Sequence, residues 1–374
     1  MITEPGVYSC IDNAAYHTGP GISKSGLDLI HRSPLHYKYL IDAANDNPPT
    51  PAQALGTAAH MLILEPAAFV QQYCLALRPS DVPHAIDDRD QLVAMVAKLN
   101  EGRLPKLPTG GTKSEQIDRI LEHGTGNRDE LEQCKATDLK AMIEQFNVRR
   151  DGLLPTSGSR HELADLLRAN GVDVTLWSDV QAEWLANNQG RTVLSQEAWE
   201  QLHAMRDAVM EHPAANALLT GIPGKAELSV YWNDPDTGEL CRCRPDFWRD
   251  DDLLIDLKTT EDASQEGFSK SIANWRYDVQ DPYYQDGVQL ATGRKPRGFV
   301  FIAVEKRPPY AVGVYTLDDE SRALGRAQYR ADLRRYAACR QANEWPGYGN
   351  KIQSICVPAW HLSRNQYLLE GGEA

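Results

Sequence analysis

A chain of 374 residues is long enough for one large domain, or for a core domain with an added module. Hydrophobic residues make up 42% and charged residues 24%, as in ordinary globular proteins, and no apolar run is long enough to cross a bilayer. The net charge of −13 argues against a protein that coats nucleic acid, because phosphate binding requires a local excess of Lys and Arg. It does not exclude an enzyme that grips DNA in one basic groove.

The N-terminal sequence and the cysteines indicate the compartment. The first ten residues, MITEPGVYSC, lack the basic and then apolar pattern of a signal peptide, so we expect a cytoplasmic protein. The cysteines are odd in number, without a CxxC pair, and their spacing suits neither a zinc ribbon nor a disulfide framework. We therefore predict reduced, mainly structural thiols at Cys10, Cys74, Cys134, Cys241, Cys243, Cys339 and Cys356.

Residues 1–102 are predicted to form the N-terminal helical part of the main domain. A first helix begins at Ser25, where an acidic residue three positions on completes a capping box. A Pro-rich break covers residues 45–51. A strongly apolar helix over residues 52–64 follows, carries His60, and is ended by a Glu-Pro pair.

Residues 103–175 differ in character and are predicted to be a helical insertion. Capping boxes begin two of its helices, at Thr112 and Ser159, each with a glutamate three positions on. Between them lie a helix over residues 136–146 and an extended loop. This pattern resembles SAP- or HeH-like modules, a class of small DNA-binding domains. The alternative is a plain helical insertion without a DNA contact.

Residues 176–374 are predicted to contain the core of the main domain. After a helical stretch, the hydrophobic period changes from that of helices to that of strands. The order of elements describes a mixed sheet flanked by helices. The elements are hairpin strands at 226–232 and 239–247, a buried strand at 253–259, a loop and helix at 261–292, strands at 298–306 and 310–317, and an Arg-rich helix at 318–342.

Three ionisable residues of this core carry the predicted chemistry. Asp246 ends one strand and Asp256 lies in the next, so pairing of the two strands would bring both carboxylates to one edge. Lys258 points to the same face as Asp256, because side chains alternate along a strand. Such carboxylates suit hard cations, and a nearby ammonium can offset charge on a phosphate. A DLK triplet also occurs by chance, but burying these charges is costly unless they pair or bind metal.

Several segments together resemble the RecE-type exonucleases (exonuclease VIII) of the PD-(D/E)xK, or RecB-like, nuclease superfamily, found in phage and prophage recombination. They include ISKSGLDLIHRSPLHYKYL, LGTAAHMLILEP, CRCRPDFW, LLIDLKTTEDAS, YDVQDPYYQDG and WPGYGNKIQSICVPAW. The resemblance covers roughly residues 6–75 and 190–360. It implies a PD-(D/E)xK restriction-endonuclease-like α/β core with a mixed central sheet flanked by helices, interrupted by the helical insertion.

The resemblance also implies the residues of a metal site. His60 matches a helix-borne histidine that joins the metals, although a lone histidine on an apolar helix is otherwise a hydrogen-bonded core residue. Asp246 and Asp256 match the metal-binding carboxylates, and the backbone carbonyl of Leu257 is an expected further ligand. Lys258 matches the catalytic lysine.

Further candidates surround this set. Gln280 and Tyr284 match the QxxxY element and share one helical face, where they hold DNA phosphate or order the site, or else simply pack on the helix surface. Glu227 either faces the metals or is a surface strand residue. Arg242 and Arg244 share a face beside the site and either bind phosphate or pair with carboxylates.

A last set of candidates concerns DNA contacts outside the metal site. Arg276, with its neighbours Trp275 and Tyr277, is a candidate for contact with an unpaired base. Four arginines recur every four residues of the last long helix and form one face. They are candidates for phosphate binding, for ion pairs with nearby carboxylates, or for a subunit interface: Arg322, Arg326, Arg330 and Arg334.

The expected function is metal-dependent hydrolysis of linear double-stranded DNA. The resemblance implies processive 5′→3′ digestion that leaves 3′ single strands for a RecT-type annealing protein, and a homo-tetrameric ring. Two Mg²⁺ ions, replaceable by Mn²⁺, are expected, with no membrane partner. No P-loop occurs, so ATP is not expected, and the cysteines do not match the iron–sulfur relatives, so no cluster is expected. The rivals are a PD-(D/E)xK endonuclease and a catalytically inactive DNA-binding or scaffold protein.

Overall fold

The computed structural model describes residues 4–9, 11–42 and 50–369. Cys10 and most of the predicted Pro-rich break lie outside the described residues. The chain forms two compact units, one of Met1–Tyr73 with Leu194–Ala374 and the other of Cys74–Val193. The predicted insertion at 103–175 lies inside the second unit, which begins earlier in the chain.

The first unit is built on a five-stranded mixed sheet with the order β10-β9-β8-β7-β4. Strands β8 and β9 are parallel, and the other neighbours are antiparallel. A parallel pair needs a crossover connection, which two helices supply between these strands. The strands are β4 (Gly224–Ala226), β7 (Phe247–Arg249), β8 (Leu253–Thr260), β9 (Gly298–Glu305) and β10 (Val312–Tyr315). The predicted mixed sheet is confirmed.

A second, three-stranded sheet contains the predicted hairpin. It has the order β1-β5-β6, from β1 (Gly6–Tyr8), β5 (Ser229–Asn233) and β6 (Leu240–Cys243). Each of the two predicted hairpin strands is broken, because β4 and β7 continue the same arms in the larger sheet. Strands that change sheets must turn a corner at that point. At one corner Glu227 has a left-handed backbone with φ 54°, and its N–H donates to the carbonyl of Asp246 at 3.1 Å.

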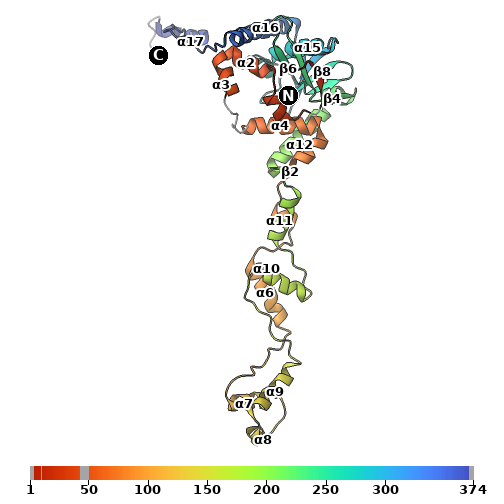
Figure 1. Cartoon of the computed structure of the whole chain (residues 1–374), viewed down its shortest axis with the longest axis vertical. Coiled ribbons are helices and arrows are strands. Elements are labelled where there is room, and N and C mark those ends of the chain that lie inside the picture. Colours follow the sequence, from red (N-terminus) through yellow and green to blue (C-terminus); the bar gives the residue numbers. More distant parts are fainter. Residues whose placement is uncertain (1–3, 10, 43–49, 370–374) are drawn as a thin grey trace. The chain divides into compact units, whose positions relative to one another are not determined.

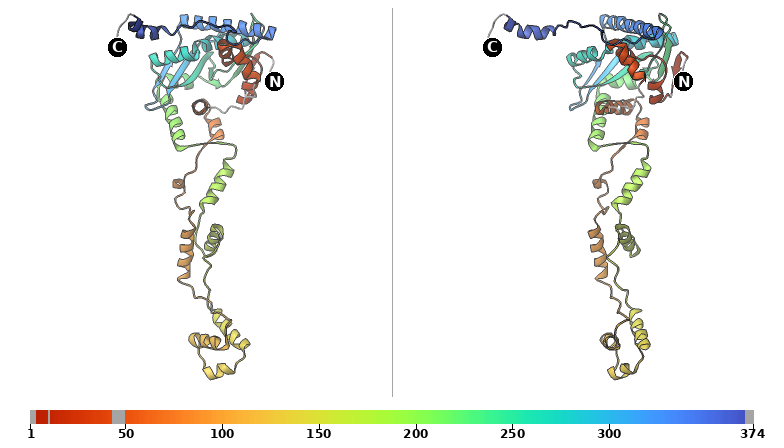
Figure 2. Two further views of the ribbon diagram at one scale, coloured as in Figure 1. Left: turned by 90° about the vertical axis from the view of Figure 1, so that its left-hand side faces the viewer. Right: turned by 60° about the vertical axis from the view of Figure 1, so that its left-hand side comes forward.

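Helices cover both faces of the larger sheet (Figures 1 and 2). Leu254, Phe299 and Phe301 face one helical layer, while Ile255 and Ile302 face the other, as alternation along the strands requires. The first layer contains α2 (Lys24–Arg32), α14 (Gln265–Trp275), α15 (Tyr277–Thr292) and α16 (Asp319–Ala342). The second contains α4 (Pro51–Leu64), α5 (Pro66–Gln72), α12 (Gln196–Glu211) and α13 (Pro213–Thr220). The unit also includes α1 (Asn13–Thr18), α3 (Pro34–Asp42) and α17 (Ala359–Leu369).

Local signals set several helix ends. The apolar helix α4 follows Thr50, which accepts from the backbone N–H of Gln53, and it stops before the Glu-Pro pair as predicted. The predicted capping box at Ser25 is wrong. Helix α2 begins earlier, because the hydroxyl of Ser23 accepts from the N–H of Gly26. The segment 261–292, predicted as a loop and one helix, contains two helices. They meet at Arg276, whose φ is 54°.

The second unit consists of small helical cores. One lies between α6 and α10, and another is formed by α7, α8 and α9. Both predicted capping boxes, at Thr112 and Ser159, are confirmed. The elements are η1 (Pro79–Asp81), α6 (Arg89–Asn100), α7 (Lys113–His123), α8 (Arg128–Gln133), α9 (Ala136–Asn147), α10 (Arg160–Ala169) and α11 (Trp177–Asn187). The connecting strands β2 (Tyr73–Leu75) and β3 (Thr192–Leu194) pair with each other.

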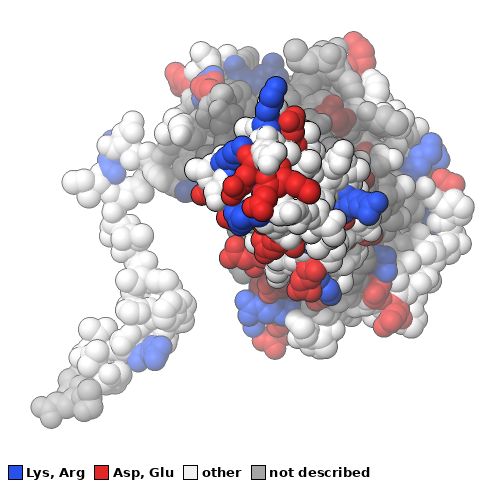
Figure 3. All heavy atoms as spheres, turned by 90° about the horizontal axis from the view of Figure 1, so that it is seen from below, with Lys and Arg blue, Asp and Glu red and all other residues white. Residues whose placement is uncertain are grey.

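The α7–α9 end of this unit carries both signs of charge. Figure 3 looks onto this end, where Asp and Glu side chains lie at the centre of the visible face with Lys and Arg among them. A contact of this module with DNA stays a prediction. Among the described helices, none is long and apolar enough to cross a membrane.

Candidate metal centre

The pairing of β7 with β8 brings the two aspartates together. Phe247 lies opposite Ile255 and Trp248 opposite Leu254. Continuing this antiparallel register by one residue sets Asp246 opposite Asp256. Both carboxylates therefore meet at the corner where the hairpin leaves the larger sheet.

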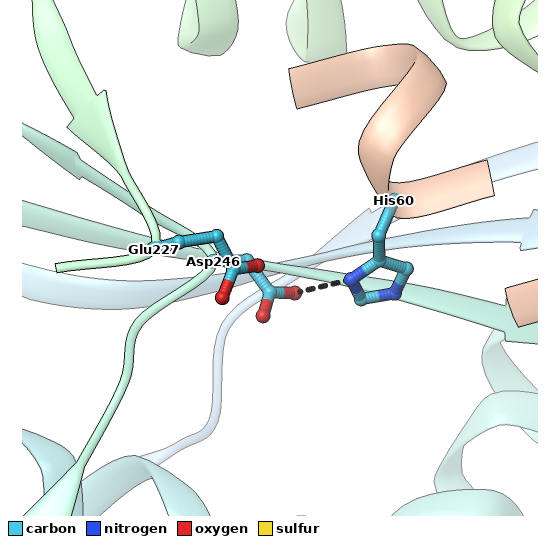
Figure 4. Close-up of side chains that lie close together, drawn as sticks. All are labelled: His60, Glu227 and Asp246. Carbon is cyan, nitrogen blue, oxygen red and sulfur yellow. Dashed lines mark ion pairs between the residues drawn. The ribbon is translucent and has the colours of Figure 1, made fainter. Parts of the chain in front are cut away.

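Three side chains from separate elements form a cluster at this corner (Figure 4). One ligand atom from each of His60, Glu227 and Asp246 lies within 4.8 Å of the other two. His60 comes from α4, and each carboxylate comes from one of the two corners between the sheets. The Oδ2 atom of Asp246 accepts from the backbone N–H of Leu257 at 2.7 Å and lies 3.4 Å from His60 Nδ1. The structure thus places Glu227 in a cluster with His60 and Asp246; that Glu227 faces a metal there stays a prediction.

Asp256 and Lys258 form a deeper layer beside the cluster. Asp256 is fully buried, and its Oδ1 accepts from Gln280 Nε2 at 2.5 Å. Its Oδ2 forms an ion pair with Lys258 Nζ at 2.5 Å. The amide and the ammonium together offset the cost of burying this carboxylate.

The electrostatics indicate an excess of negative charge. Burial, and then the nearby Asp246 carboxylate, raise the pKa of Glu227 to about 8 and that of Asp256 to about 7. Burial alone would lower the pKa of Lys258, but the Asp256 and Asp246 carboxylates outweigh it and hold that pKa above its ordinary value. Burial lowers the pKa of His60, which favours the neutral imidazole that ligates metals. A divalent cation would relieve the repulsion among these carboxylates.

The helix α15 supplies two contacts to the deeper layer, and one of them was missed from the sequence. Gln280 orients Asp256, as described above. The ring of Tyr277, three residues earlier on the same helical face, lies 4.7 Å from Lys258 Nζ, a cation–π contact. The three-residue spacing between Tyr277 and Gln280 was the one sequence feature that could have predicted this contact with Lys258. Tyr284 instead packs on Phe299, with ring centroids 6.0 Å apart, and burial raises its pKa well above the ordinary value.

The two arginines of β6 and its corner are buried and hold neighbouring segments. Arg242 donates to the carbonyl oxygens of His17 at 2.9 Å and Pro20 at 3.0 Å, and also to Gly19. Arg244 donates to the Ser229 hydroxyl at 2.9 Å and lies 3.9 Å from a Glu227 carboxylate oxygen. Arg244 therefore contacts the cluster of His60, Glu227 and Asp246 through Glu227.

Most of the remaining candidate arginines lie in ion pairs. Arg276 lies between Asp28 at 2.9 Å and Asp332 at 2.5 Å. Three of the four candidate arginines of α16 likewise face carboxylates, which is one of the three alternatives for this helix face, whereas Arg334 is exposed; phosphate contacts by these arginines stay a prediction. The pairs are Arg322 with Asp281 at 3.4 Å, Arg326 with Asp286 at 2.8 Å, and Arg330 with Asp234 at 2.8 Å.

Comparison with known proteins bears on the same region. Residues 175–357 match the model of a family described as a PDDEXK-like domain of unknown function (DUF3799). These residues form a PD-(D/E)xK-like domain. The match spans Glu227, Asp246, Asp256, Lys258 and Gln280, while His60 lies outside it. The predicted PD-(D/E)xK fold class is confirmed.

Other comparisons add little. A crystal structure named "Putative exonuclease", from Eubacterium rectale, is similar with 13% identity and a TM-score of 0.35, covering 59% of this chain and 84% of that one. No curated protein matches the chain.

The donor set of the cluster formed by His60, Glu227 and Asp246 fits a divalent cation. Carboxylate oxygens are the ligands that Mg²⁺ and Mn²⁺ prefer, and imidazole is accepted by Mn²⁺ and its neighbours in the series. His60, Glu227 and Asp246 would hold it, with the Asp256–Lys258 ion pair beside them.

Proposed function

We propose that this protein is a metal-dependent exodeoxyribonuclease that hydrolyses linear double-stranded DNA from its ends. The observation that carries the proposal is the buried Asp256–Lys258 pair set directly beside the three-residue cluster of His60, Glu227 and Asp246. A bare metal-storage site would have no use for an ammonium among its ligands. A phosphodiesterase can use one, because charge develops on the phosphate during attack.

The side chains divide the chemistry as follows. Bound divalent cations supply Lewis-acid polarisation of the phosphate and a more acidic water. Lys258 stays protonated at neutral pH, since its pKa is raised, so it acts as a fixed positive charge and hydrogen-bond donor and not as a base. Gln280 fixes the rotamer of Asp256, and Tyr277 holds the Lys258 ammonium over its ring.

A groove beside the cluster offers a path for the DNA strand. It has a volume of about 990 Å³ and is bordered by His60, Glu227 and Arg244. Lys225, which is exposed, lies on the same border two residues from Glu227. The acidic net charge of the chain is thus compatible with local contacts to phosphate at this border.

The finer features of the proposal rest on the sequence resemblance to RecE-type exonucleases. They are two Mg²⁺ ions replaceable by Mn²⁺, ATP-independent and processive 5′→3′ digestion, and 3′ overhangs passed to a RecT-type annealing protein in phage recombination. A homo-tetrameric ring in the cytoplasm belongs to the same proposal.

The test is digestion of linear duplex DNA, labelled at one 5′ end, beside closed circular DNA, with Mg²⁺ or with EDTA. We expect loss of the linear DNA from its ends, survival of the circle, and no reaction in EDTA. Asp256→Asn should be inactive, whereas Asp236→Asn, a matched change on the hairpin turn with a side chain 58% exposed, should keep full activity. Cutting of the circle would favour an endonuclease. DNA binding without any cleavage by the wild type would favour an inactive DNA-binding protein.

A further inference from the structure

A small hollow lies beside Lys258, and it shares no lining residue with the groove that His60 and Glu227 border. Its volume is about 200 Å³, below the roughly 300–1,000 Å³ of pockets that take drug-sized ligands. It is therefore too small for a duplex. The residues that line it include Lys258, Glu261, Phe268, Trp275, Tyr277 and Lys306.

The hollow combines aromatic surface with a positive charge at its inner end. Trp275 is 65% exposed, so much of its ring surface is open to a ligand. Tyr277 and Phe268 add further ring surface. Aromatic faces next to an ammonium suit a nucleotide, because the base stacks on the rings and the phosphate pairs with the positive charge.

The main chain at Trp275 is fixed although the ring is open. The carbonyl of Trp275 accepts from Lys24 Nζ at 2.6 Å, and Lys24 is paired with Asp28 at 2.8 Å. The next residue, Arg276, has a left-handed backbone and ends the helix there. A ring presented on a fixed backbone loses little entropy when it stacks on a ligand.

The outer rim of the hollow is acidic. Glu261 is 67% exposed and pairs with Lys306 at 3.1 Å, and Asp262 lies beside it. These carboxylates would repel a second phosphate. The hollow can therefore take one base whose phosphate lies at Lys258, but not a strand that runs onward.

We propose that this hollow receives the terminal, unpaired nucleotide of the strand being cut, with its base stacked on Trp275 and its phosphate toward Lys258. The inference rests on the proposed nuclease function, and it explains why such an enzyme acts at DNA ends. The base must leave its duplex partner to enter, so the enzyme reads a frayed end.

The first measurement is binding, which does not depend on hydrolysis. In an Asp256→Asn background, the affinity for a short, fluorescently labelled oligothymidylate is measured with Mg²⁺ present. Trp275→Ala should weaken binding about tenfold, the scale of one lost stacking contact, and Trp275→Phe should keep most of it. Trp360→Ala, which removes a tryptophan of similar exposure (66%) on α17, should change nothing. Equal affinity of the Trp275→Ala and parent proteins would overturn the inference.

The second measurement is the rate of digestion from two linear duplexes that differ only in whether the terminal base pair is matched. With Trp275 intact, digestion should start faster at the mismatched end, and Trp275→Ala should remove that preference while still cutting. An active enzyme whose preference survives Trp275→Ala would refute the subsite but leave the nuclease function standing. If the wild type cuts nothing, the function fails, and the binding series still decides whether the hollow holds a base.

Discussion

Replacing Glu227 by glutamine tests whether the carboxylate cluster is under electrostatic stress without metal. The side chain keeps its shape but loses its charge. Burial and the neighbouring Asp246 raise the pKa of Glu227 from 4.5 to about 8. In the metal-free protein the folded state therefore holds a proton between about pH 4.5 and 8, where the unfolded chain has released it. The stability of the wild type should fall as pH rises through this window, and the Glu227→Gln protein should lack this part of the fall.

The size of the effect follows from the displaced pKa. One pKa unit corresponds to about 1.4 kcal/mol, so the full displacement sets a ceiling near 5 kcal/mol. The Glu227 side chain is 32% exposed, and solvent screening reduces the effect. We expect Glu227→Gln to raise the free energy of unfolding by about 1–2 kcal/mol at pH 9 and to leave it nearly unchanged at pH 5.

The assay is urea unfolding in EDTA across this pH range, followed by circular dichroism. Glu266→Gln is the matched control, because its side chain is 83% exposed on α14, and its unfolding curve should stay parallel to that of the wild type. Added Mg²⁺ should stabilise the wild type more than Glu227→Gln, since the cation loses one ligand in the variant. Parallel pH curves for the wild type and Glu227→Gln, or a less stable variant at pH 9, would refute the reasoning.

Three further changes test the surrounding structure. Gly325→Ala should destabilise the fold by about 3 kcal/mol in urea unfolding, because a Cβ there would lie 1.8 Å from the Asp278 carbonyl oxygen where α15 and α16 cross; unchanged stability would contradict that crossing. Arg242→Ala should lower the free energy of unfolding by about 2–3 kcal/mol, because it leaves the carbonyl oxygens of His17 and Pro20 without their donor. Arg334→Ala, at an exposed position, should change it by no more than about 0.5 kcal/mol. Equal effects of the two variants would show that burial does not decide the cost. Lys258→Met should lower the cleavage rate at least about 100-fold while calorimetry still detects divalent cation binding; loss of both would mean that the lysine builds the site and does not act in it.

The sequence alone was enough to predict the central sheet and its two charged residues on one face. Period-two alternation places Asp256 and Lys258 together, and the apolar run around them predicts a buried strand. The turn between the hairpin strands has a local cause, because the Asp234 side chain accepts from the backbone N–H of Thr237 at 2.9 Å. The ends of α4 have local causes too. These features could be predicted because they depend on neighbours in the chain.

The tertiary structure alone decided where the hairpin arms break and what the charged residues contact. No local sequence pattern indicates that the chain at Glu227 passes from one sheet to the other. The break depends on pairing with strands of both sheets, which are distant in sequence. The pairing of the α16 arginines with aspartates, and the place of Tyr277 over Lys258, depend on how helices pack on the sheet. The sequence therefore determined which residues carry the charge, whereas packing determined which charges are neutralised and which remain free to bind a cation.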